Sequence, residues 1–160
     1  MNMNDRAADG TPRRFESTVP FRSHRIHTAA VYCSDGRFGQ QIDEFLRHSL
    51  GTALCDRLAV PGGPAALRPD PELPEDSRGI LEQLAFLVRA HELQQVILIA
   101  HEPCAFYRER LGVSDDRQHA RQVEDLKAAA RVVGTLASLQ VDLYTARLVE
   151  DLVRFESVAL

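Results

Sequence analysis

Val96-Ile97-Leu98-Ile99-Ala100 is the clearest buried-strand pattern in this sequence, and His101-Glu102-Pro103-Cys104 follows it directly. An unbroken apolar run is typical of a central parallel strand that helices cover on both faces. In such sheets, functional side chains gather where the strands end. The sequence therefore predicts an α/β fold in which His101 and Cys104 lie at the carboxyl end of the central strand.

Strand and helix patterns alternate on both sides of this run. Apolar stretches bounded by turn residues predict further strands at 28–33, 54–60, 141–148 and 153–158. Helical spacing of apolar residues predicts helices at 38–48, from residue 76 or 77 to about 91, and at 117–137. The apolar face predicted for the last helix consists of Val123, Leu126, Ala130 and Val133. The last two strands are close enough in sequence to pair as antiparallel neighbours. We therefore expect a mostly parallel sheet of about four strands with an antiparallel edge strand and helices on both faces.

Length and composition are those of one globular domain. The chain has 160 residues, of which 44% are hydrophobic and 26% are charged. We expect a flexible or partner-docked arm over residues 1–22, which are polar, and one α/β domain over residues 23–160.

Charge, hydropathy and cysteine content exclude several classes of protein. The net charge of −4 argues against nucleic-acid binding. No apolar run approaches the ~20 residues that cross a bilayer, so no membrane association is expected. Three cysteines are too few for a secreted disulfide framework, which favours reduced thiols and a cytoplasmic protein.

Two strand ends carry side chains that bind metals. Cys33-Ser34-Asp35-Gly36-Arg37 closes the strand at 28–33, and His101-Glu102-Pro103-Cys104 closes the central one. Thiolate and imidazole are the ligands that zinc prefers, and a catalytic zinc keeps three protein ligands and one open position. If the two strands are neighbours, Cys33, His101 and Cys104 can converge on one zinc ion. Taken singly, Cys33 or Cys104 would be interpreted as a small buried hydrophobe before it would be interpreted as a ligand.

The two motifs together resemble the signature of the β-class carbonic anhydrases, which is Cys-x-Asp-x-Arg after the first strand and His-x-x-Cys after a later one. The resemblance covers roughly residues 28–158 and includes Gly62-Gly63, which is similar to the family's glycine-rich turn. It implies the family's fold and Zn²⁺ bound by Cys33, His101 and Cys104. It also implies hydration of carbon dioxide to bicarbonate by a zinc-bound hydroxide.

The resemblance also assigns the neighbouring residues. Asp35 and Arg37 match the family's catalytic dyad, in which the guanidinium holds the carboxylate. Asp35 then either accepts a hydrogen bond from zinc-bound water or occupies the fourth zinc position. Gly62 and Gly63 are candidates for the substrate pocket. Outside the motif, Asp35–Arg37 reads as a turn salt bridge and the glycines as a tight turn.

Several positions depart from the family pattern. Ala105 stands where the family has glycine, Ala59-Val60 where it has arginine and asparagine, and Pro61 where alanine is common. These changes affect the expected pocket and leave the ligands intact. They keep two alternatives open: a zinc hydrolase of carbon disulfide or carbonyl sulfide, and a catalytically inactive zinc-binding regulatory protein. A metal-free thiol redox protein that uses Cys33 and Cys104 is a further reading. Members of the family assemble as dimers or larger oligomers, so a homodimer at least is expected.

Overall fold

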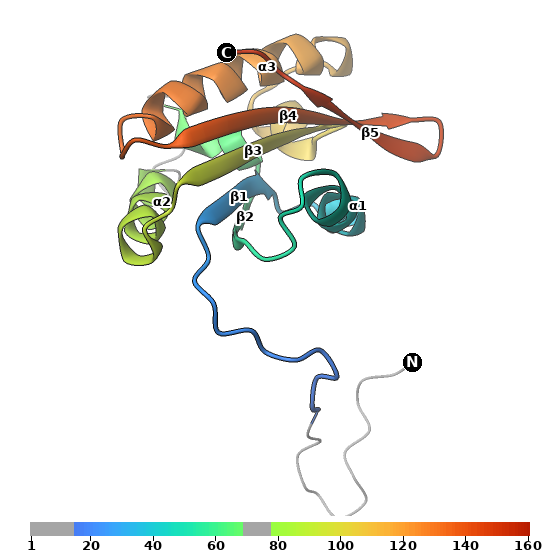
Figure 1. The fold of residues 1–160 in the computed structure, drawn as a ribbon. Helices are drawn as coiled ribbons and strands as arrows, with labels where there is room; N and C mark the ends of the chain where they lie inside the picture. Colours follow the sequence, from blue (N-terminus) through green and yellow to red (C-terminus); the bar gives the residue numbers. More distant parts are fainter. Residues whose placement is uncertain (1–14, 69–77) are drawn as a thin grey trace, which may run out of the picture.

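The computed structural model describes residues 15–68 and 78–160, and its centre is a five-stranded sheet (Figure 1). The strand order is β2-β1-β3-β4-β5. Strands β1 to β4 run parallel, and β5 pairs antiparallel with β4. The strands are β1 (Thr28–Cys33), β2 (Asp56–Val60), β3 (Gln95–Glu102), β4 (Gln140–Val149) and β5 (Leu152–Ser157). This confirms the predicted four parallel strands with an antiparallel edge strand.

Helices cover both faces of the sheet. Alternate side chains of β1 and β3 pack with α2 (Arg78–His91) and α3 (Asp115–Val133) in one apolar cluster. The intervening side chains pack against α1 (Gly39–Glu44) and its flanking turns, η1 (Gly36–Phe38) and the π-helical η2 (Phe45–Ser49). Figure 1 shows α1 and α3 on opposite sides of the sheet. The period-2 alternation of a strand thus divides one apolar run between two cores.

The register of β1 and β3 brings the two motifs together. Tyr32 pairs with Ile99 in the parallel ladder, so Cys33 and Ala100 are the next residues along their strands. The segments that follow therefore leave the sheet at the same edge. Two shorter helical segments, η3 (Gly63–Leu67) and η5 (Phe106–Arg110), pack at this edge.

Some predicted boundaries shift. His101 was expected just after the central strand, but it lies within β3, because the long strand β4 extends the ladder to Glu102 and Arg147. The helix predicted over 117–137 spans 115–133. The helix begins earlier because Asp115 and Asp116 in its first turn favour a helix N-terminus. It ends earlier because the backbone N–H groups of Thr135 and Leu136 make i→i−3 hydrogen bonds, which form tight turns. The predicted start of α2, at residues 76 and 77, lies outside the described residues.

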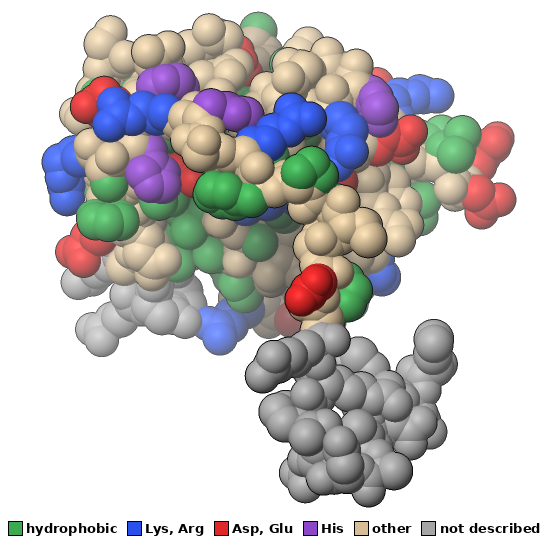
Figure 2. Space-filling view, turned by 60° about the horizontal axis from the view of Figure 1, so that its bottom comes forward, with side chains coloured by type: hydrophobic (Ala, Val, Ile, Leu, Met, Phe, Trp, Pro, Cys, Tyr) green, Lys and Arg blue, Asp and Glu red, His purple; other side chains and the backbone are tan. Residues whose placement is uncertain are grey.

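The surface carries mixed charge. Figure 2 shows Lys, Arg and His side chains in a band across one face, with acidic side chains among and beside them. Ion pairs join Arg25 to Glu92 and Arg57 to Asp43. Residues 15–25 are exposed and extend away from the sheet (Figure 1). In the described part of the chain, no helix has the length and hydropathy needed to cross a membrane.

Candidate metal centre

Cys33, His101 and Cys104 form one buried cluster at the carboxyl edge of the sheet. One ligand atom from each residue lies within 4.8 Å of the other two. Cys33 ends β1, His101 belongs to the neighbouring β3, and Cys104 follows two residues after β3. The parallel pairing of β1 and β3 produces this convergence, and the structure thus brings together the three residues that the sequence predicts as ligands.

The imidazole of His101 has the surroundings of a metal ligand. The residue is 2% exposed, and among the described residues neither ring nitrogen has a hydrogen-bond partner. The ring of Phe38 lies against it, with ring centroids 4.3 Å apart. A buried polar atom without a partner costs about 1–3 kcal/mol, so this arrangement calls for a further interaction. Coordination of a metal ion supplies one, and the donor set therefore fits zinc.

The two cysteine sulfur atoms lie 4.0 Å apart. At this distance, ionisation of one thiol opposes ionisation of the other. The contact with the Cys104 thiol holds the pKa of Cys33 well below its usual range, with His101 acting in the same direction. The same contact, together with burial, raises the pKa of Cys104. A divalent cation between the sulfur atoms would supply the charge needed to ionise both thiols.

Asp35 and Arg37 form a bidentate pair beside the cluster. The Arg37 side chain donates from Nε to Oδ1 (2.9 Å) and from Nη2 to Oδ2 (2.5 Å), and its backbone N–H also donates to Oδ1. Asp35 also occupies the N-cap position of η1. Hydrogen bonding from Arg37 lowers the pKa of Asp35 to about 2, so its carboxylate is ionised and accepts hydrogen bonds at neutral pH.

The replacement Arg37→Ala is expected to raise the pKa of Asp35 from about 2 toward 3.8, because the largest cause of the lowering is removed. With a depressed native pKa, the pair stabilises the folded chain above the unfolded pKa, and this contribution is lost as the pH falls toward 2. Carboxyl ¹³C chemical shifts followed by NMR against pH measure the pKa directly. An unchanged Asp35 pKa in the variant would show that Arg37 does not control this carboxylate.

Gly62 and Gly63 lie in the turn after β2, where Gly63 packs against the backbone at the end of β1. Gly63 has φ of +55°, and a Cβ there would lie 2.7 Å from the backbone nitrogen of Cys33. At Gly62, where φ is +78°, a Cβ would meet the ring of Phe106 at 2.5 Å. Both positions therefore require glycine for conformation and for space. These contacts support the tight-turn interpretation, and a substrate contact by either glycine stays a prediction.

Sequence reasoning missed three buried polar residues on α3: Gln118, Gln122 and Asp125. Gln122 donates to the carbonyl oxygen of His101 (2.7 Å), and Gln118 accepts from the backbone N–H of Cys104 (2.9 Å). Asp125 accepts from Tyr107, which belongs to η5 just after Cys104. Their spacing could have indicated that they are buried, because they fall on the same helical face as the predicted apolar residue Leu126.

The chain is similar to carbonic anhydrases in sequence and in fold. A sequence model of the family described as "Putative carbonic anhydrase" matches residues 23–151. No curated protein matches the chain.

Three solved structures show the same fold. The β-carbonic anhydrase isoform I of Trichomonas vaginalis has 14% identity and a TM-score of 0.53, with 89% of this chain and 87% of that chain covered. The carbonic anhydrase of Glaciozyma antarctica has 16% identity and a TM-score of 0.55, with coverage of 83% and 82%. That of Streptococcus mutans has 15% identity and a TM-score of 0.50, with coverage of 84% and 82%.

Proposed function

Because the chain belongs to the carbonic anhydrase family, as a divergent member with the β-class fold, we propose that it is a zinc-dependent lyase that hydrates carbon dioxide reversibly to bicarbonate. The observation that supports this most is the cluster of Cys33, His101 and Cys104, whose ligand atoms lie within 4.8 Å of one another. Among residues 15–68 and 78–160, no hydrogen-bond partner for either imidazole nitrogen is found. A purely structural zinc usually takes four protein ligands, whereas three leave one position for chemistry.

Zinc held by these residues would lower the pKa of a coordinated water molecule toward ~7 and so supply a nucleophile at neutral pH. Asp35 would orient that water, because its ionised carboxylate can only accept hydrogen bonds. Arg37 keeps the carboxylate in one orientation through two parallel hydrogen bonds. In the overall reaction, water adds to carbon dioxide, and bicarbonate and a proton are released.

Asp35→Asn is expected to lower the rate of carbon dioxide hydration by about 10²-fold, the lower range for loss of a positioned acid–base group. Zinc content should stay at the wild-type value, because Asp35 lies outside the three-residue cluster. Stopped-flow rates normalised to zinc content separate the two effects. A variant that loses its zinc would instead support Asp35 as a fourth ligand, and one with the wild-type rate would remove Asp35 from the mechanism.

The direct test of the function is stopped-flow carbon dioxide hydration by the zinc-loaded full chain between pH 7 and pH 9. We expect turnover that requires zinc and rises with pH. Stoichiometric zinc without turnover on carbon dioxide would contradict the proposal. The same protein would then be assayed on carbon disulfide and carbonyl sulfide, since the altered position Pro61 follows Val60, which pairs with Cys33, and Ala105 follows Cys104. Inactivity on all three substrates would favour a regulatory zinc protein.

We further propose that the chain acts in the cytoplasm as a homodimer or larger homo-oligomer. The family resemblance supports the assembly, and the free thiols of Cys33, Cys55 and Cys104 support a reducing compartment. Light scattering coupled to size-exclusion chromatography gives the mass directly. A mass near 17.9 kDa, that of one chain, would contradict the dimer.

A further inference from the structure

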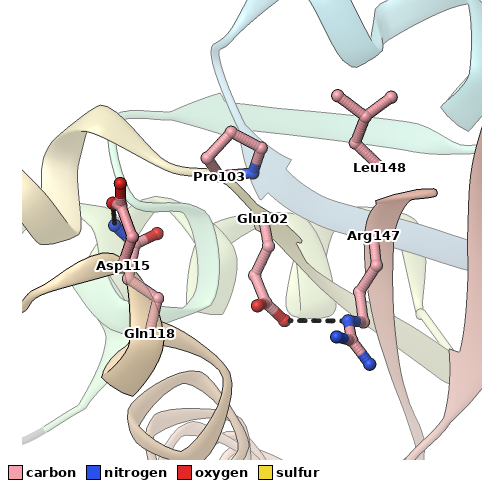
Figure 3. A pocket seen from close by; sticks show the side chains of 6 residues that line it. All are labelled: Glu102, Pro103, Asp115, Gln118, Arg147 and Leu148. Carbon is pink, nitrogen blue, oxygen red and sulfur yellow. Dashed lines mark hydrogen bonds and ion pairs between the residues drawn. The ribbon is translucent and has the colours of Figure 1, made fainter. Parts of the chain in front are cut away.

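Both ligands of the His101–Cys104 segment are held through their backbone groups by one helix. Gln122 is fully buried, and its Nε2 donates to the His101 carbonyl oxygen at 2.7 Å. One turn earlier on α3, the buried Gln118 accepts from the Cys104 N–H at 2.9 Å through Oε1. Gln118 is oriented in turn by Asp115, which accepts from its Nε2 at 2.8 Å (Figure 3).

These contacts matter because the imidazole lacks the usual support. In most metal sites, the second ring nitrogen of a histidine ligand donates to a carboxylate or carbonyl, which fixes the orientation of the ring. In the described chain, neither nitrogen of His101 has such a partner. Glu102, the nearest carboxylate in sequence, is engaged with His119 (2.6 Å) and with Arg147 (Figure 3). The hydrogen bond from Gln122 to the His101 carbonyl oxygen and the ring of Phe38 therefore help to hold the imidazole in place.

We infer that Gln118 and Gln122 are the positioning residues of the metal centre, and that α3 sets the metal affinity through them. This inference rests on the proposed zinc site. The two amides act in opposite directions: Gln122 must donate to His101, whereas Gln118 must accept from Cys104. An ionised glutamate keeps the size of the side chain and the acceptor oxygens but has no donor. The two positions should therefore respond differently to the same replacement.

The test is the zinc dissociation constant of the full chain, measured by competition with a chelator. Gln122→Ala and Gln122→Glu should each weaken zinc binding by about 10- to 100-fold, the usual effect of losing a residue that supports a ligand. Gln118→Ala should weaken binding by about 10-fold. Gln118→Glu should weaken binding less than Gln122→Glu does, because a carboxylate at position 118 still accepts from the Cys104 N–H.

A matched control is Gln95→Ala at the opposite end of β3. Gln95 is half-buried and donates to Asp142 at 2.6 Å, so its loss removes a comparable hydrogen bond far from the ligands. We expect its zinc dissociation constant to equal that of wild type. The absorption spectrum of the cobalt-substituted protein gives a second readout, which should change in Gln122→Glu and be retained in Gln95→Ala.

The outcomes separate this inference from the proposed function. A wild-type chain that binds no zinc would overturn the metal site itself. Tight wild-type binding with the same affinity in all four glutamine variants would overturn only the positioning role. Equal losses in Gln118→Glu and Gln122→Glu would also contradict it, because that result means general disruption of α3 instead of two directed hydrogen bonds.

Discussion

Replacing Cys104 with serine is expected to abolish stable zinc binding and carbon dioxide hydration together. Cys104 supplies one of the three ligand atoms in the cluster, and among the described residues the cluster holds only Cys33 and His101 besides it. Zinc sites in small domains contribute roughly 10–16 kcal/mol, so the loss of one ligand in three costs about 4 kcal/mol, or about 10³-fold in affinity. Serine is nearly isosteric but is a poor zinc ligand.

Cys55→Ser is the matched control for this experiment. Cys55 is half-buried, lies outside the cluster and is the third free thiol of the chain. We expect it to keep one zinc per chain and wild-type turnover, while metal analysis and stopped-flow show the loss of both in Cys104→Ser. If Cys104→Ser kept wild-type zinc affinity, Cys104 would not be a ligand. If both serine variants lost zinc equally, the effect would reflect general damage to the fold.

Asp125→Ala is expected to destabilise the folded chain by about 3–5 kcal/mol, the usual cost of removing one partner of a buried ion pair. Oδ1 of Asp125 accepts from Arg68 (2.9 Å) and Arg121 (3.0 Å), and Oδ2 accepts from the hydroxyl of Tyr107 (2.8 Å). The Asp125 and Arg68 side chains are only 5% and 7% exposed, so in the variant Arg68 loses a buried partner that water does not readily replace.

Urea unfolding of the metal-free protein measures this free energy without a contribution from zinc. The control is Asp43→Ala, which breaks the exposed pair with Arg57 and should cost less than about 1 kcal/mol. A comparable small loss in Asp125→Ala would show that the buried network contributes little to stability. Because Tyr107 follows the ligand loop closely, the variant is also expected to bind zinc less tightly.

The fold could be predicted from sequence because its strands are short, apolar and bounded by clear turn signals. The pattern at 28–33 coincides with β1, and the run at 96–100 lies inside β3. The convergence of Cys33, His101 and Cys104 followed from the rule that parallel strands end at one edge. It required only that β1 and β3 be neighbours, which the ladder confirms.

The residues around the ligands could not be predicted in the same way. Gln118, Gln122 and Asp125 are polar, and polar residues on a helix usually face water. They are buried because this part of α3 lies against the end of β3 and the segment after it, and that placement depends on tertiary packing that no local pattern encodes. The predicted apolar face of α3 included Val123, which is only half-buried, whereas Gln122 beside it is fully buried.

The central claim of this account is a zinc ion bound by two sulfur atoms and one imidazole. X-ray absorption at the zinc edge of the purified full chain tests it most directly. We predict one zinc per chain with two sulfur neighbours at ~2.3 Å and two nitrogen or oxygen neighbours at ~2.0–2.1 Å. No bound zinc, or a zinc surrounded only by nitrogen and oxygen, would contradict it.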